Sequence, residues 1–291
     1  MYVDSHCHID RYPRPTEVLD AAELARVVTV AVTETPSAFQ ALTVKAGRRP
    51  MLRVALGLHP MRAARISRHE LLLFRRMLQR TDYVGEVGLD FSPQGRPTRA
   101  RQVEIFEHIL AEPDIHAKVL TVHSRGAEGD TIRLLIDAHA HAILHWYSGA
   151  LKHLDAALGA GMWFSVNTSM LSSRNGRRIL AALPPERVVT ETDGPYTRQL
   201  GRPNDPSTVP ALVAALAALW NEDPELTRAR LFDNMALLYR TATAGIKHAP
   251  EGEPALRERQ PDTIPTSFHD VNGRTRHVHP AEGQTREEAW F

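Results

Sequence analysis

Two histidines near the N-terminus have the spacing of a metal site. His6 and His8 lie at the end of a short apolar run, and side chains at positions i and i+2 of a β-strand point to the same face. Two imidazoles on one face can bind one transition-metal ion. The chain contains 15 histidines, and the same spacing recurs at 139–141 and 277–279. We expect neither later pair to bind metal, because the first lies where a helix passes into the beginning of a strand and the second lies in the C-terminal segment.

Further ligand-type residues accompany other apolar runs. Glu86 lies inside such a run next to glycines, where an ionised carboxylate without a partner would cost several kcal/mol, so Glu86 needs a cation. His123, His145 and Asp193 lie at the ends of three more runs. A single histidine in such a place is most often a hydrogen-bonded core residue. Six ligand-type residues in five runs are poorly explained by that alternative.

Eight short runs rich in Val, Ile, Leu and Thr predict the strands that must position these residues. The segments between them carry helix signals, such as Pro15 and Ser67 at expected helix starts. Strands that are apolar throughout are typical of a parallel sheet with helices outside. The expected strands are 3–5, 26–32, 52–58, 83–89, 118–122, 142–146, 162–166 and 187–192.

This alternation predicts an α/β fold, and its length and number of units favour a (β/α)8 TIM-like barrel, in which functional residues lie at the carboxyl ends of the strands. An open, doubly wound sheet is the alternative. No strand is followed by a Gly-rich dinucleotide fingerprint, because the glycines at 57 and at 85–88 have the wrong spacing.

Composition bounds the class of protein. The chain has 291 residues, 43% of them hydrophobic and 24% charged, which is enough apolar material for a substantial core. Its net charge of +1 excludes the global positive field of a protein that coats nucleic acid. The single cysteine, Cys7, excludes an internal disulfide framework. With neither a secretory signal nor an apolar run of membrane-spanning length, we expect a cytoplasmic protein without membrane contact.

The composition changes after Gly245. Residues 246–291 contain five prolines and only 12 apolar residues, too few to build a core. We therefore expect two regions, a barrel domain over 1–245 and a C-terminal extension over 246–291. The extension is either weakly structured or a segment that docks on a partner protein.

The motifs at the strand ends resemble, in chain order, the signatures of the TatD-like metal-dependent deoxyribonucleases. The resemblance covers about residues 1 to 240, and each motif falls at an expected strand end. It implies a (β/α)8 barrel of the amidohydrolase superfamily, two divalent metal ions and hydrolysis of phosphodiesters, often from a DNA end. The motifs are Asp4–His8, 57–60, 85–90, 122–125, 145–149 and 191–196, with further landmarks at 202–206 and 233–236.

The resemblance also implies roles for the ligand-type residues. His6 and His8 with Asp193 would hold one metal ion, His123 with His145 the other, and Glu86 would bridge the two. A carboxylate between two cations offsets their repulsion, and such a pair can clamp a phosphate and acidify a bound water. Asp193 is then placed to act as general base, so Asp193 and Glu86 are the expected catalytic residues. The ligand set is compatible with Mg, Mn or Zn.

Substrate contacts are expected on the rim of the site. His59 and Arg125 adjoin strand ends and can bind phosphate oxygens, while Arg62 and Arg198 are expected to be solvated surface charges. Tyr147 and Trp146 could stack a terminal base, although Trp146 could equally pack the barrel. The landmark at 202–206 adds Arg202 and Asn204 as substrate-binding residues. The near-neutral charge predicts a local contact with a DNA end rather than with a long duplex.

At some motif positions this chain has other residues than the family usually has. Trp146 and Tyr147 stand where a small residue and Phe are usual, and Gly194 stands where Ala is common. These residues are similar to those of variant TatD-like proteins in bacterial Qat anti-phage clusters. The similarity implies a role in antiviral defence, with other subunits of a defence complex as partners of the C-terminal extension.

Two other functions are compatible with the sequence. The same metal scaffold polarises carbonyl groups, so hydrolysis of an amide or an ester is an alternative. The chain could also serve as an assembly subunit of a defence complex rather than as an enzyme.

Overall fold

The computed structural model describes residues 1–199, 201–244, 267–269 and 275–277. The chain divides into two units, Met1–Lys247 and His248–Phe291. The first unit ends two residues after the boundary expected at 245. In the second unit the described residues form two short antiparallel strands, β11 (Ser267–His269) and β12 (Thr275–His277).

Eight parallel strands form the centre of the first unit, and each overlaps one of the expected apolar runs. They form two hydrogen-bonded sheets, one of β1 to β3 and one of β4 to β8. The strands are β1 (Tyr2–Cys7), β2 (Val27–Ala31), β3 (Leu52–Val54), β4 (Tyr83–Gly88), β5 (Val119–His123), β6 (His141–Leu144), β7 (Trp163–Val166) and β8 (Val188–Thr190).

Contacts between the two sheets close them into a barrel. On one side a parallel bridge joins Leu56, just beyond β3, to Val84 of β4. On the other side the Thr190 hydroxyl of β8 donates to the carbonyl of Val3 in β1. Because β1 thus contacts both β2 and β8, the sheet has no free edge at this point, and the expected (β/α)8 barrel is confirmed in place of the open sheet.

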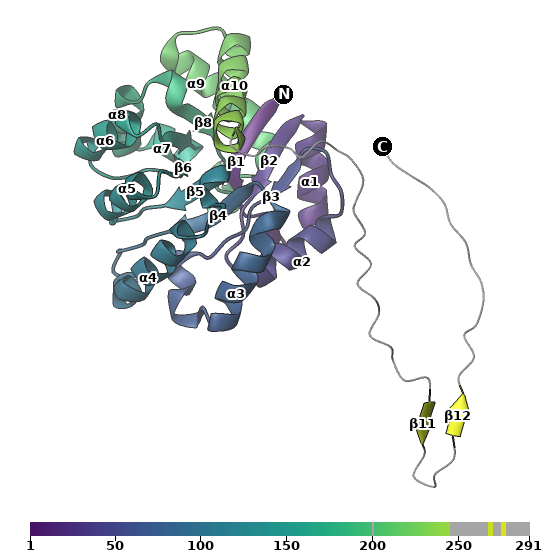
Figure 1. Ribbon diagram of the computed structural model, residues 1–291. Coiled ribbons are helices and arrows are strands. Elements are labelled where there is room, and N and C mark those ends of the chain that lie inside the picture. The colour runs from purple at the N-terminus through teal and green to yellow at the C-terminus, as the bar shows by residue number, and fades with distance from the viewer. Residues whose placement is uncertain (200, 245–266, 270–274, 278–291) are drawn as a thin grey trace. The chain divides into compact units, whose positions relative to one another are not determined.

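Helices follow the strands and lie outside them, with α1 to α6 and α8 around the barrel in Figure 1. Seven of them begin where the sequence supplies a capping side chain or a proline. The helices are α1 (Pro15–Leu24), α2 (Pro36–Ala46), α3 (Arg68–Met77), α4 (Arg99–Leu110), α5 (Glu128–Asp137), α6 (Leu154–Gly159), α7 (Thr168–Ser172), α8 (Arg174–Ala182), α9 (Val209–Trp220) and α10 (Pro224–Thr243).

Local chemistry explains these starts. The Ser67 hydroxyl accepts the Glu70 backbone N–H at the start of α3, and Asp223 caps α10 in the same way, accepting from Glu225 and Leu226. Such caps satisfy N–H groups that have no partner within the helix. Proline is the first residue of α1, α2 and α10, where its missing N–H carries no penalty.

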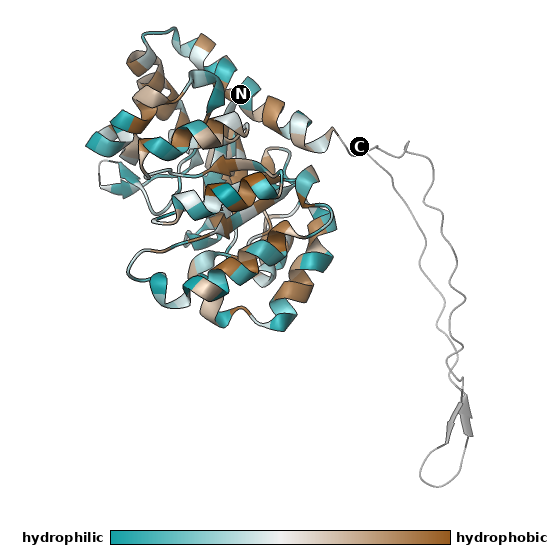
Figure 2. Ribbon diagram, turned by 60° about the vertical axis from the view of Figure 1, so that its left-hand side comes forward, coloured by the Kyte–Doolittle hydropathy of each residue, from teal (hydrophilic) through white to brown (hydrophobic). Residues whose placement is uncertain are grey.

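The last helix closes one end of the barrel. Met235, Leu238 and Ala242 of α10 pack against apolar side chains near the starts of the strands, among them Val3 and Trp163. Helices in Figure 2 carry both teal and brown residues, as helices do that bury only one face. Access to the barrel interior is therefore left to the opposite end, where the strands finish and the ligand-type residues lie.

No helix in the described part of the chain is long and apolar enough to cross a membrane.

Candidate metal centre

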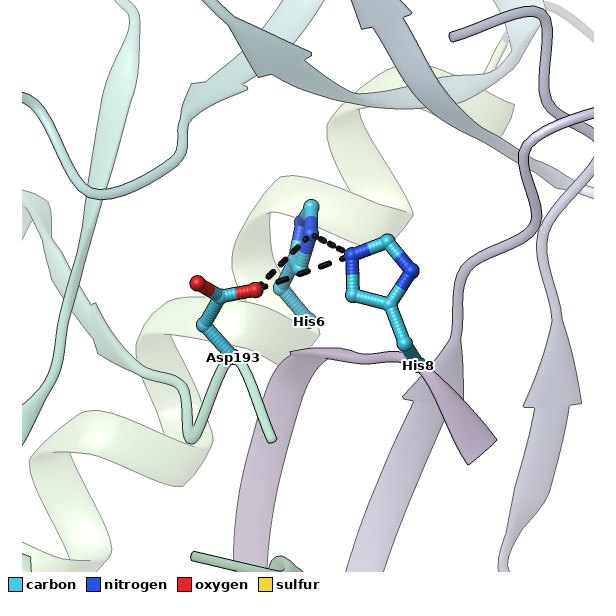
Figure 3. A group of neighbouring side chains, drawn as sticks. All are labelled: His6, His8 and Asp193. Atoms are coloured by element: carbon cyan, nitrogen blue, oxygen red, sulfur yellow. Dashed lines mark hydrogen bonds and ion pairs between the residues drawn. The ribbon is translucent and has the colours of Figure 1, made fainter. Parts of the chain in front are cut away.

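Two histidines and one aspartate converge at the carboxyl end of β1. The Nε2 atoms of His6 and His8 are 3.4 Å apart, and they lie 3.8 and 3.6 Å from Oδ1 of Asp193. Figure 3 shows His6 and His8 near the end of β1 and Asp193 reaching toward them from the loop after β8. All three side chains are buried.

A buried aspartate for which no role was predicted, Asp4, connects β1 with the segment after β8. Asp4 Oδ1 accepts the backbone N–H groups of His6 (3.2 Å) and Thr192 (2.9 Å), and its Oδ2 accepts the Thr192 hydroxyl (2.6 Å). Asp193 follows directly, and its N–H donates to the His6 carbonyl (2.9 Å). Asp4 thus fixes the register that places Asp193 beside His6.

Glu86 occupies the middle of the centre and is 2% exposed. Its Oε2 lies 3.5 Å from His6 Nε2 and 3.2 Å from His8 Nε2. Its Oε1 lies 2.7 Å from His123 Nδ1 and 3.3 Å from His145 Nε2. The two carboxylate oxygens therefore face two different histidine pairs, which is the arrangement of a bridging ligand.

The second histidine pair is oriented by two carboxylates outside the expected ligand set. Asp90 Oδ2 lies 2.8 Å from His123 Nε2, and Glu191 Oε2 lies 3.2 Å from His145 Nδ1. A carboxylate behind a histidine fixes which ring nitrogen keeps its lone pair, a common feature of metal sites. Glu191 is in turn held by Ser165 and Asn167 of the neighbouring chain segment. Asp90 and Glu191 both belong to the strand-end motifs, but only the fold shows that their carboxylates contact the histidine ligands.

The donor set fits divalent metal ions. In a tetrahedral site with bonds of about 2.0–2.1 Å, neighbouring ligand atoms lie about 3.3 Å apart. The distances among His6, His8 and Glu86 are 3.2 to 3.5 Å. Imidazole nitrogens that face each other so closely repel unless a proton or a cation lies between them. His6, Glu86 and His145 form a second group of convergent ligand atoms.

Charge and burial prepare these groups for a cation. Burial, with the neighbouring His145, lowers the pKa of His6 to about 3, so its imidazole is neutral at physiological pH. Burial opposes ionisation of Glu86, but the surrounding imidazoles, chiefly His59 and His145, outweigh it and lower the pKa of Glu86 well below its ordinary value. His6 and Glu86 therefore have the forms that bind metal, a neutral imidazole and an ionised carboxylate. Burial opposes ionisation of His8, His123 and His145, but the neighbouring carboxylates outweigh it and raise the pKa of all three.

Asp193 differs from Glu86 in its protonation. Burial raises the pKa of Asp193 to about 7, against the opposing effect of His145 and His8. A carboxylate with a pKa near neutrality can both lose a proton to the solvent and accept one from a reacting group. The same buried site therefore contains a firmly ionised carboxylate and a readily protonated one.

The centre opens into a pocket of about 440 Å³. Arg125 and Ser124, which follow β5, lie in its wall, as do two aromatic side chains, Trp146 and Tyr196. Tyr196 is 55% exposed and packs edge-on against His8, with ring centroids 4.9 Å apart. The pocket wall thus combines hydrogen-bond donors with aromatic faces. The sequence reading assigned no role to Tyr196, although it lies in the motif at 191–196.

His59 lies in the pocket wall as expected, with a fixed orientation. Its Nδ1 accepts the Met61 backbone N–H (3.1 Å), so its Nε2 carries the proton and points to Glu86 Oε2 at 3.2 Å. In this form His59 is a hydrogen-bond donor at the edge of the centre. That geometry is compatible with its expected contact to a substrate oxygen.

Tyr147 is a core residue, which contradicts the expected contact with substrate. It is 1% exposed, its hydroxyl donates to the Ala150 carbonyl (2.8 Å), and its ring packs edge-on against Phe164. Trp146, with a positive φ of 39°, breaks the strand alternation after β6. Because of this turn, Trp146 lines the pocket and Tyr147 points into the core.

Neither residue of the expected landmark at 202–206 lines the pocket. Asn204 is buried, and its amide donates to the hydroxyls of Thr168 (2.9 Å) and Thr197 (2.8 Å), so it stabilises the loop after β8. Arg202 is exposed in β10 (Arg202–Pro203), which pairs with β9 (Arg198–Gln199). Polar residues in a strand-end loop can stabilise the loop itself, and spacing alone does not separate that role from binding.

The histidine pair at 139–141 lies away from the centre. His141 is the first residue of β6, at the opposite end of that strand from His145, and His139 precedes it in a left-handed turn with φ of 49°. His277 ends β12 in the second unit, and His279 lies outside the described residues.

Comparison with known proteins identifies relatives along most of the first unit. The family described as TatD related DNase matches residues 3–240. An uncharacterised metal-dependent hydrolase of Methanocaldococcus jannaschii is 24% identical over 248 residues, which are 82% of this chain and 97% of that protein. The 3'-5' ssDNA/RNA exonuclease TatD of Edwardsiella piscicida is 31% identical over 181 residues, 57% of this chain and 69% of that protein. A deoxyribonuclease of Homo sapiens is 29% identical over 66% of this chain and 77% of its own length.

Solved structures show the same fold. A TatD homologue from Escherichia coli superposes with a TM-score of 0.75 at 24% identity, over 82% of this chain and 98% of its own. A TatD family hydrolase from Entamoeba histolytica has a TM-score of 0.68 at 16% identity, over 82% of this chain and 97% of its own.

Proposed function

Because this chain belongs to the family of TatD related DNases, we propose that it is a metal-dependent hydrolase that cleaves phosphodiester bonds of nucleic acid, working from a strand end. One observation carries the proposal: five ligand-type side chains, four of them buried, converge around the buried Glu86 at the base of an open pocket with Arg125 in its wall. Relatives named as exonucleases of single-stranded DNA and RNA support a nucleic-acid end as the substrate.

We assign the metal ligands from the geometry of the centre. His6, His8 and Asp193 would hold one divalent ion, His123 and His145 a second, and Glu86 would contact both. Bound ions would supply Lewis-acid polarisation of a phosphate and a more acidic water. Mg, Mn and Zn all remain compatible with these ligands.

The protein's own groups then supply the proton chemistry. Asp193, with a pKa raised to about 7 by burial, can accept the proton of an attacking water and release it to the solvent. Glu86 stays ionised and offsets positive charge in the centre. His59 can donate from Nε2 to an oxygen of the substrate at the edge of the centre.

The pocket wall would bind the nucleotide. The guanidinium of Arg125 matches phosphate oxygens in a bidentate manner. Trp146 and Tyr196 offer aromatic faces on which bases of any identity can stack. These groups suit an unpaired end, because the bases of a duplex are already stacked on each other.

The test is release of nucleotides from end-labelled DNA. We expect purified protein with Mg, Mn or Zn to shorten single-stranded DNA faster than duplex DNA, and EDTA to abolish the activity. Asp193→Asn should lower kcat by about 10²- to 10⁴-fold, because an amide cannot accept the proton of the water. Asp137→Asn, at an exposed position on α5, is the matched control and should retain wild-type activity.

Wild-type protein that is loaded with metal and yet releases no nucleotide from any of these substrates would refute the nuclease proposal. Hydrolysis of p-nitrophenyl acetate by the same preparation would then favour the amide or ester hydrolase.

A role in anti-phage defence is a further part of this proposal. It is supported by Trp146 and Gly194, the residues that differ from the common family pattern. Cells with the native gene cluster should resist phage, and Asp193→Asn should remove that resistance if nuclease activity serves defence. Full resistance with Asp193→Asn would favour the assembly subunit.

A further inference from the structure

A second cavity, of about 280 Å³, lies on loops that follow three neighbouring strands. Its walls come from the segments after β1, β2 and β3, at the same end of the barrel as the metal centre. Three arginines line it, together with two glutamates and smaller side chains. The lining residues are Arg11, Glu34, Thr35, Ala38, Arg62, Arg65, Ile66 and Glu70.

Glu34 organises the arginines. Its carboxylate is 10% exposed, and its Oε2 accepts from Arg11 Nη2 at 2.6 Å and from Arg62 Nε. Arg62 was expected to be a solvated surface charge and is instead held by this ion pair. Burial opposes ionisation of Glu34, but its bonds to Arg62 and Arg11 prevail and keep its pKa below the ordinary value. The two guanidinium groups therefore have defined positions instead of moving freely in solvent.

Most of the arginine donors remain available. A guanidinium has five N–H donors, and each contact to Glu34 uses one of them. Arg65 forms no ion pair within the part of the chain that the structure describes. The other lining glutamate, Glu70, accepts the Ser37 hydroxyl at 2.7 Å. Asp10 also pairs with Arg11, with Oδ2 3.7 Å from Nε, so the cavity is close to neutral in charge. The three guanidinium groups still keep many donors unused, and among the described residues Arg65 keeps all of its own clear of ion pairs.

The arginine cluster, which is the set Arg11, Arg62 and Arg65, is rigidly connected to the metal centre. The Glu34 carbonyl accepts the backbone N–H of His59 (3.0 Å). Thr33, the residue before Glu34, exchanges backbone hydrogen bonds with Gly85 (3.0 Å) and Glu86 (2.9 Å). A group bound in the cavity would thus be held in register with the site of hydrolysis.

Tyr196 lies in the wall of the metal-centre pocket. Its ring contacts His8 of the metal centre. Burial raises the pKa of its phenol, as do the nearby carboxylates of Glu34 and Glu86, whereas Arg11 lowers it, so charges of both sites act on this side chain.

We propose that the arginine cluster is a second phosphate subsite, which binds a backbone phosphate of the same strand whose scissile phosphate lies at the metal centre. The subsite rests on the proposed nuclease function and adds to it a preference for substrates of more than one nucleotide. A guanidinium pair with fixed spacing binds the phosphodiester backbone independently of sequence. The cleaved strand would run from the metal centre, past Tyr196, to Arg62.

Steady-state kinetics on substrates of graded length test the subsite. The probes are thymidine 5'-(p-nitrophenyl phosphate), which spans only the metal centre, and single-stranded oligothymidylates of increasing length. In wild-type protein kcat/KM should rise with length until the subsite is filled. Arg65→Ala and Arg62→Ala should each raise KM for the long oligonucleotide about tenfold, in line with one lost charge-assisted hydrogen bond, with little change in kcat.

Salt provides a second readout. The slope of log KM against log salt should fall by about 0.7 for each arginine removed, as expected for one lost phosphate contact to a single strand. Arg65→Ala is the safer variant for folding, because no ion pair of the described residues is broken. Arg133→Ala, on an exposed pair of α5, is the matched control and should change neither readout.

Two results would overturn the subsite. If Arg65→Ala and Arg62→Ala reduce the kcat/KM of the small diester and of the oligonucleotide by the same factor, the arginines act on the fold or the metal centre and bind no second phosphate. If neither variant changes KM while wild-type protein cleaves both probes, the arginine cluster is an ion-pair network alone. Wild-type protein that cleaves neither probe would instead remove the nuclease proposal, and the subsite with it.

Discussion

At the scale of single residues, the centre depends on one carboxylate whose two oxygen atoms have different neighbours. Glu86 is the only ligand-type residue whose two oxygens contact different histidine pairs among the described residues, with His6 and His8 on one side and His123 and His145 on the other. Histidines so close together would repel as imidazolium groups. An ionised Glu86 offsets that charge and would do the same for bound cations.

We expect Glu86→Ala to lower metal occupancy at both positions rather than at one. Inductively coupled plasma mass spectrometry of purified protein would show the loss, with up to two divalent ions in the wild type. His139→Ala removes an imidazole at the far end of β6 and should leave the metal content unaltered. Full metal content in Glu86→Ala would exclude the bridging role.

At the scale of elements, the ends of strands decide which side chains reach the pocket. β6 ends at Leu144, the following residue His145 still bonds back to Val122 (3.0 Å), and Trp146 then turns the chain with a positive φ. This single turn places Trp146 in the pocket wall, which is one of the two places expected for it, and buries Tyr147, which was expected to contact substrate. Similarly, the loop after β2 places Glu34 where it can hold arginines from two other loops.

Trp146→Ala and Tyr147→Ala should separate binding from stability. Loss of a stacking face worth about 1–3 kcal/mol should raise KM for single-stranded DNA about five- to 150-fold in Trp146→Ala, with a small change in melting temperature. Tyr147→Ala empties a buried site and should lower the free energy of unfolding by about 3–5 kcal/mol. Urea unfolding and KM measured on both variants would check this, and the opposite pattern would restore Tyr147 as the substrate contact.

The Glu34 ion pairs should make part of the stability depend on pH. The folded-state pKa of Glu34 lies below its ordinary value of 4.5, so the stabilising effect is present above pH 4.5 and is lost as the pH falls through the lower folded value. Glu34→Gln should therefore be less stable than the wild type near neutrality, and the difference should shrink in acid. Urea unfolding at a series of pH values measures the difference.

Glu17→Gln is the control for this pH effect. Glu17 lies on α1, its partner Arg14 precedes that helix, and both are exposed, so the pair contributes little. A wild-type advantage over Glu34→Gln that stays constant down to about pH 3 would contradict the lowered pKa of Glu34.

At the scale of the whole molecule, one closed barrel supplies both the scaffold and the site. The described core extends from Val3 to Ala242, and α10 fills the end of the barrel that the metal centre does not use. With a net charge of +1, the proposed attraction to nucleic acid would have to come from local groups such as Arg125 and the arginine cluster. Binding should accordingly involve few phosphates and a modest salt dependence.

Deletion of His248–Phe291 tests how far the first unit is self-sufficient. Because the described core lies within Met1–Lys247, we expect the truncated protein to keep its melting temperature, metal content and nuclease activity. In cells, loss of phage resistance with intact nuclease activity would assign the C-terminal segment to partner docking. Loss of the fold itself would show that the barrel needs this segment.

The sequence by itself determined the barrel and the identity of the ligand-type residues. Apolar runs alternate with helix signals, and a carboxylate such as Glu86 in a buried run requires cationic partners, so these features could be read from local pattern and the cost of burying charge. The strand-end position of His6, His8, His123, His145 and Asp193 follows from the same pattern.

The tertiary structure alone decided which polar residues face the pocket and which support it. Asp4, Asp90 and Glu191 act through partners that are 33 to 188 residues away, and Glu34 binds arginines from two other loops. Tyr147 and Asn204 carry polar groups that are satisfied inside the protein. Periodicity reports only which face of a regular element a side chain occupies. Backbone turns such as that at Trp146, and contacts between loops, are set by the packing of the whole barrel.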